Sequence, residues 1–124
     1  MENCRLALFH RHFLMIIQNN LLLEIKNYCK DNPFEETCGF IVESDDNLIF
    51  IPIKNRHLDK KNYFLISPKD YIEIKNKYKI EYFFHSHLSN PFFSKLDILY
   101  QKYHNINMLI YNIDSDEMIE RKCN

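Results

Sequence analysis

The residues most suited to a chemical role are two histidines followed by a serine and an aspartate. His85 and His87 stand one residue apart, and Ser94 and Asp97 follow within ten residues of the second histidine. In a strand, residues two apart face the same side and lie about 7 Å apart along the chain. Zinc binds imidazole nitrogens and carboxylate oxygens, and its catalytic sites keep a fourth position for water. The spacing therefore indicates a candidate metal centre.

Each half of this pattern also has an ordinary explanation. A second pair of histidines with the same spacing, His10 and His12, has no acidic residue nearby in the sequence. Ser94 and Asp97 are close to a capping box at the start of a helix, which needs no metal. Neither half is therefore sufficient on its own.

Two further features favour the metal. Phe83 and Phe84 directly precede His85 and predict a buried strand, where imidazoles need polar or metal partners. Glu36 lies three residues before Gly39, the single glycine of the chain. A lone glycine indicates a close approach of two backbones or an irregular strand. By itself, however, Glu36 would be interpreted as an exposed acid at the entrance of a strand.

The elements that must position these residues alternate between strands and helices. Apolar runs and alternation predict strands at 13–17, 37–42, 48–53, 63–66 and 80–87, and a closing hairpin at 107–113 and 118–122. We expect helices from Asn19 or Asn20 to about Lys30, from Ser67 onward, and from Ser94 to about His104. The inner faces would carry Leu21, Leu22, Ile25, Tyr28 and Cys29 in the first helix, Tyr71, Ile74 and Tyr78 in the second, and Leu96, Leu99, Tyr100 and Tyr103 in the third. The fold class is α/β in the α+β sense, a mixed sheet with about three flanking helices.

Size and composition fit a single domain over residues 1–124, with 1–12 as a possible N-terminal extension. A net charge of -1 gives no reason to expect nucleic acid or an acidic membrane as a partner. The sequence contains neither a secretory signal nor a membrane-spanning stretch. No two of the four cysteines form a C-x-x-C pair. We therefore expect reduced cysteines and a cytoplasmic location.

Taken together, the stretch Glu36-Thr37-Cys38-Gly39-Phe40-Ile41, the triplet His85-Ser86-His87, Ser94 and Asp97 resemble the JAB/MPN domain with its JAMM metalloprotease motif. The resemblance covers about residues 13–122. It implies a curved, cytidine-deaminase-like core and one Zn²⁺ per chain held by His85, His87 and Asp97. It also implies that Glu36 is the general base and that Ser94 helps to hold the oxyanion.

Within this family the chain most resembles the compact prokaryotic and phage JAB domains. It implies hydrolysis of a peptide or isopeptide bond, with a peptide or a ubiquitin-like protein as substrate. In a phage, tail components would be partners and the virion tail the location. The family usually has proline after the second histidine and seven residues before the serine. This chain has Leu88 and six residues, 88–93. The shorter segment leaves open a structural, non-catalytic assembly role, and a simple metal-binding regulator is a third alternative.

Overall fold

The computed structural model describes residues 4–6, 11–90 and 92–123, with side chains from residue 19 onward. In this part of the chain the strands are β1 (Cys4–Leu6), β2 (Cys38–Ser44), β3 (Asn47–Ile53), β4 (Lys79–His87), β5 (Asn107–Asn112) and β6 (Glu117–Cys123). The helices are α1 (Arg11–Asp31), α2 (Pro68–Lys77) and α3 (Lys95–His104). They form the mixed α+β architecture that the sequence predicts.

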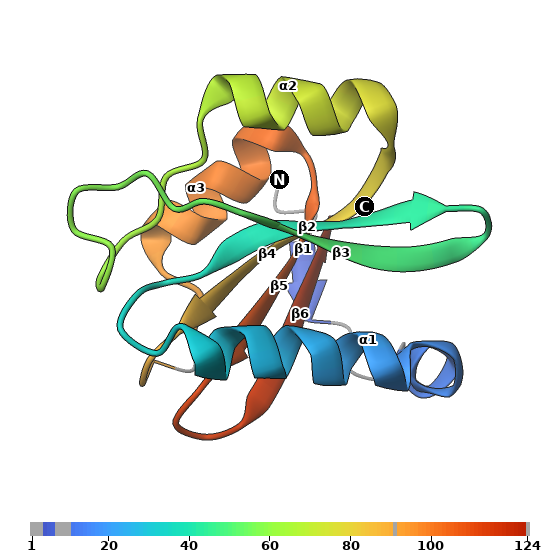
Figure 1. Cartoon of the computed structure of the whole chain (residues 1–124), viewed down its shortest axis with the longest axis horizontal. Coiled ribbons are helices and arrows are strands. Elements are labelled where there is room, and N and C mark those ends of the chain that lie inside the picture. The colour runs from blue at the N-terminus through green and yellow to red at the C-terminus, as the bar shows by residue number, and fades with distance from the viewer. Residues whose placement is uncertain (1–3, 7–10, 91, 124) are drawn as a thin grey trace.

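The described strands form a six-stranded sheet in the order β1-β6-β5-β4-β2-β3. The pair β4 and β5 is parallel and is connected through α3, whereas the other neighbouring strands are antiparallel. Helix α1 covers one face of the sheet, and α2 and α3 cover the other (Figure 1). The carboxyl end of β4 therefore opens toward the start of α3.

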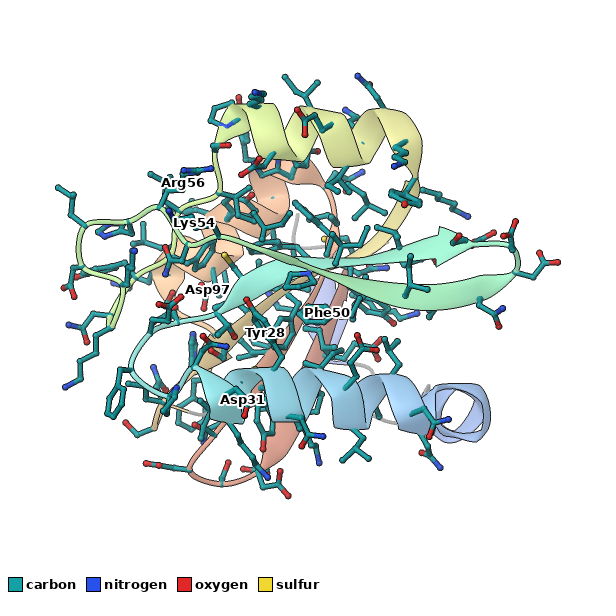
Figure 2. All side chains as sticks on the ribbon, in the orientation of Figure 1. Tyr28, Asp31, Phe50, Lys54, Arg56 and Asp97 are labelled. Carbon is teal, nitrogen blue, oxygen red and sulfur yellow. The ribbon has the colours of Figure 1, made fainter. Side chains whose placement is uncertain are left out.

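Alternation along the central strands builds a core on each face of the sheet. Phe84 packs with Ile25 of α1 on one side, and Phe83 packs with Ile66 on the other. On the α1 side, the ring of Tyr28 meets that of Phe50 at 5.6 Å between centroids (Figure 2). Because both faces of β4 are covered, the polar residues that end this strand are buried as well.

Gly39 is required by the close approach of β2 and β3. A Cβ atom at this position would lie 2.4 Å from the carbonyl oxygen of Ile51, far inside van der Waals contact. The close backbone approach expected from the single glycine is therefore confirmed. The β2–β3 turn uses Asp45 and Asp46, both with positive φ, a backbone region that Asp tolerates better than most residues.

Two strand predictions are wrong. Residues 13–17 lie inside α1, which starts at Arg11 and not at a cap near Asn19 or Asn20. A short apolar run does not distinguish strand from helix, and no glycine or proline interrupts the chain between 11 and 32. Residues 63–66 form a loop, in which the backbone of Tyr63 bonds to Asp59 and Asn55 and that of Leu65 bonds to Asn55 and Arg56.

The inner face of α1 is confirmed for Leu21, Ile25 and Cys29, but the inner face predicted for α3 is largely wrong. Tyr100 is half-buried, whereas Leu96, Leu99 and Tyr103 are exposed, and the buried residues of α3 are Asp97 and Gln101. The polar side of this helix faces inward because Asp97 meets the histidines and Gln101 donates to the carbonyl of Arg121.

The prediction of reduced cysteines is correct for Cys29 and Cys38, which are free and buried, and wrong for Cys123, which is disulfide-bonded. The possible N-terminal extension contributes β1 and the start of α1, and its residues 1–3 and 7–10 lie outside the described residues.

The described helices are too short or too polar to cross a lipid bilayer.

Candidate metal centre

His85 and His87 occupy the carboxyl end of β4 and project to the face covered by α2 and α3. Their Nε2 atoms lie 3.1 Å apart, and both residues are buried. Strand β4 holds them rigidly because it is paired with β2 on one side and β5 on the other. Phe64 closes over the ring of His85 at 4.7 Å between centroids. The predicted pair is thus brought together in an apolar setting.

Asp97 reaches this pair from the first turn of α3. Its Oδ1 lies 3.0 Å from Nε2 of His85, and its Oδ2 lies 3.4 Å from Nε2 of His87. A capping box fixes the carboxylate, because the amide of Ser94 donates to Oδ2 and the amide of Asp97 donates to Oγ of Ser94. The capping and ligand interpretations are therefore compatible, and a six-residue connection suffices to deliver Asp97.

The tautomer of His87 is set by its second ring nitrogen. Nδ1 lies 2.8 Å from the carbonyl oxygen of Asn90, which can only accept, so Nδ1 carries the proton. In a neutral His87, Nε2 is then a lone pair that faces an Asp97 oxygen at 3.4 Å. Two acceptors that face each other in a buried place repel, and both are satisfied by a shared donor, such as Nε2–H of His85, or by a cation between them, either a proton or a metal ion.

Burial and close contact shift the pKa values of the groups in this cluster. Burial lowers the pKa of His85, and the hydrogen bond and charge of Asp97 offset this only in part. Burial also acts to lower the pKa of His87, but Asp97, the Asn90 carbonyl and the charge of Glu36 outweigh it and raise the pKa. Burial acts to raise the pKa of Asp97, and the hydrogen bonds to both histidines reverse this and hold it well below its usual range.

Glu36, two residues before the start of β2, brings a second carboxylate to the histidines. Its oxygen and the ring nitrogens of His85 and His87 all lie within 4.8 Å of one another, so the three residues could hold a metal ion. Burial is the main cause that raises the pKa of Glu36 to about 8, and the charge of Asp97 adds to it while His87 opposes it. A cation in this place would favour the ionised carboxylate.

The donor geometry fits a small divalent ion. Ligand atoms bonded to a tetrahedral zinc at about 2.0–2.1 Å lie about 3.3 Å from one another. The 3.1 Å between the two Nε2 atoms is close to that edge length, and Asp97 offers Oδ1 at 3.0 Å to His85 and Oδ2 at 3.4 Å to His87. Within the described part of the chain, Nδ1 of His85 has no hydrogen-bond partner. The orientation of this ring therefore depends on Nε2 and on its packing.

A buried hydroxyl pair connects the two strands that carry the site. The amide and Oγ1 of Thr37 donate to Oγ of Ser86 at 2.9 and 3.0 Å, and the amide of Ser86 donates to the carbonyl of Thr37 at 2.9 Å. Thr37 follows Glu36, and Ser86 separates the histidines. The pair therefore fixes the distance between the carboxylate and the imidazoles.

The centre lies in a cleft of about 490 Å³, within the usual size range of small-molecule sites. One wall is loop 54–67, and the other is formed by residues 88–90 and the start of α3. Asp97 lies on the side of the molecule from which loop 54–67 projects (Figure 2). Ser94 lines the cleft and accepts from the amide of Asp97, which leaves its hydroxyl proton to donate to a bound group.

Asn55 is a site residue that sequence reasoning missed. Its Nδ2 donates to the carbonyls of Glu36 and Tyr63 at 2.8 and 2.9 Å, and its Oδ1 accepts from the amides of His57 and Leu65 at 3.0 Å each. It thereby links the backbone of Glu36 to loop 54–67. An isolated asparagine after a strand is not a recognisable sequence motif. The contact of Asn90 with His87 uses a backbone carbonyl, so the residue type at position 90 does not predict it.

The sequence was compared with models of protein families and with curated proteins, and neither comparison found a match.

Proposed function

We propose that this protein is a zinc-dependent metallopeptidase or isopeptidase of the JAMM type. His85, His87 and Asp97 hold the metal, and Glu36 is the general base. The observation that carries the proposal is the convergence of two buried imidazole nitrogens on a carboxylate, with the other nitrogen of His87 already committed to Asn90. A second carboxylate, Glu36, lies within reach of the same point.

When bound, zinc supplies Lewis acidity, which polarises the scissile carbonyl and makes a water more acidic. The Glu36 carboxylate takes the proton of the attacking water and returns it to the leaving nitrogen. The hydroxyl of Ser94 donates to the carbonyl oxygen as negative charge develops, an interaction typically worth a few kcal/mol. Phe64 and Tyr100 line the cleft beside the ligands and reduce the access of bulk water.

Zinc content and turnover test the proposal together. We expect about one zinc per chain by elemental analysis of the wild type, and loss of most of it in His85→Ala and His87→Ala. His104→Gln, which changes a histidine of α3 outside the cluster, is the matched control and is expected to keep its zinc. Glu36→Gln is expected to remain folded and to lose cleavage of a peptide or a ubiquitin-like fusion by at least about a hundredfold.

A non-catalytic assembly role is the competing proposal, and the exposed apolar side chains of α3 favour it. In that case Glu36→Gln would leave function in the host intact. A folded wild-type protein that takes up no zinc at neutral pH would contradict the metallopeptidase.

A further inference from the structure

Helix α3 and the residues before it present large apolar side chains to solvent. Leu99 is 61% exposed and Tyr103 is 85% exposed, with Leu96 and Phe92 between these values. Within α3, positions 96, 99 and 103 follow the spacing by which one helix packs along another, and Phe92 lies just before the helix. We call these four residues the α3 docking face. A surface patch of large apolar side chains typically marks a contact with another protein.

The charges beside the α3 docking face are positive. All residues of α3 are described, and its exposed charged side chains are Lys95 and Lys102, because Asp97 is buried in the metal centre. The opposite wall of the cleft repeats this character. Loop 54–67 exposes Leu58 and Leu65, together with the basic residues Lys54, Arg56, Lys60 and Lys61 against a single exposed acid, Asp59. The whole chain, in contrast, has a net charge of -1.

The α3 docking face is continuous with the cleft. Leu96 belongs to both, since it is exposed on α3 and also lines the cleft that contains His87 and Asp97. A chain lying along the docking face therefore enters the candidate metal centre at its end. A second copy of this protein fits less well, because pairing two α3 helices would place the lysines of one against those of the other.

We propose that the α3 docking face binds an acidic amphipathic helix of the protein substrate and directs the adjoining segment into the cleft. Apolar side chains of that helix lie between Leu96, Leu99 and Tyr103, and its acidic side chains meet Lys95 and Lys102. The inference rests on the proposed function and specifies its substrate class, an acidic protein with an apolar helix face next to the cleaved bond.

Binding of defined peptides tests this without turnover. The probe is a fluorescein-labelled amphipathic helix about five turns long, with Leu and Phe on one face and Glu on its flanks. The comparison peptides carry Lys in place of Glu, or the same residues in scrambled order. By fluorescence anisotropy, Leu99→Ser with Tyr103→Ser, and separately Lys95→Glu with Lys102→Glu, are expected to weaken binding of the acidic helix at least about tenfold. Leu23→Ser and Lys30→Glu on the opposite side of the molecule are the matched controls and are expected to change nothing.

Several results would overturn the docking proposal. They are equal affinity for the Glu and Lys peptides, equal affinity for the scrambled peptide, and insensitivity to the α3 variants in proteins whose circular dichroism is unchanged. Preferential binding to phosphatidylserine vesicles, or dimerisation that the Leu99→Ser, Tyr103→Ser variant abolishes, would assign the face to a membrane or to a second copy. Cleavage that depends on Glu36 but occurs without binding of the acidic helix would overturn the docking proposal alone. A protein that binds the acidic helix but takes up no zinc would contradict the proposed function.

Discussion

At the scale of single residues, the candidate site depends on backbone groups whose hydrogen bonds orient the candidate metal ligands. The carbonyl of Asn90 sets the tautomer of His87, and the amide of Ser94 orients a carboxylate oxygen of Asp97. Neither contact touches a reacting bond, yet each decides which lone pair points at the centre. Second partners of this kind typically change metal affinity by about 10–100-fold when they are removed.

The buried side-chain amide of Asn55 makes four hydrogen bonds. We predict that Asn55→Ala lowers the free energy of unfolding by at least about 2 kcal/mol, because buried backbone groups lose their partners. Urea denaturation measures this. Asn62→Ala is the control, since Asn62 is exposed and bonds only to Asp59 among the described residues. Its effect is expected to stay within about 0.5 kcal/mol. Equal stability of the two variants would contradict the role given to Asn55.

At the scale of elements, α2 and α3 both begin with a serine N-cap. Ser67 accepts from the amide of Asp70 at 3.1 Å at the start of α2, and Ser94 accepts from the amide of Asp97 at 3.1 Å at the start of α3. Such caps typically contribute about 1 kcal/mol. Only the cap of α3 also places a candidate metal ligand, so the two helices form a natural comparison.

We predict that Ser67→Ala and Ser94→Ala each cost about 1 kcal/mol of stability, measured by thermal or urea unfolding. Ser94→Ala is expected in addition to weaken zinc binding, since the carboxylate of Asp97 loses the geometry of its capping box. Ser94→Thr, which keeps the hydroxyl, should restore both properties. If zinc affinity fell equally in the Ser67 and Ser94 variants, the effect would be one of general stability and not of ligand placement.

At the scale of the whole molecule, a mixed sheet separates two cores. Cys29 belongs to the core beneath α1, and Cys38 to the core beneath α2 and α3. Burial raises the pKa of Cys29 to about 11, and its hydrogen bonding with Thr37 and Ser86 offsets this only in part. Burial, followed by the charges of Glu35 and Glu36, raises the pKa of Cys38 to about 12. The two thiols thus report on opposite faces of the sheet.

The thiolate is the reactive form, so a raised pKa means less thiolate at a given pH. At pH 8 a thiol with a pKa of about 11 is about 0.1% ionised, against about a quarter for an ordinary cysteine. We predict that iodoacetamide at pH 8 leaves Cys29 and Cys38 unmodified in the folded protein and modifies both in urea, as peptide mass spectrometry would show. Modification of one thiol in the folded state would indicate that its core opens locally.

The sequence by itself pointed to the candidate residues of the centre and predicted much of its scaffold. Glu36, His85, His87, Ser94 and Asp97 were singled out from residue type, spacing and a family resemblance, and the strands and helices that carry them follow from alternation and capping. Gly39 was correctly interpreted as a close approach, because a single glycine is a local signal of backbone geometry. Local patterns suffice where the cause of a structure lies within a few residues.

Only the tertiary structure decided the rest. It showed that the polar side of α3 faces inward, that residues 13–17 belong to a helix, and that Asn55 and the carbonyl of Asn90 hold the site. Apolar periodicity predicts which side of a helix prefers burial, but the partners available across the fold decide which side is buried. Here Asp97 is buried because it contacts the imidazoles at the end of β4, and Gln101 is buried because it donates to the carbonyl of Arg121. The leucines of α3 therefore face solvent.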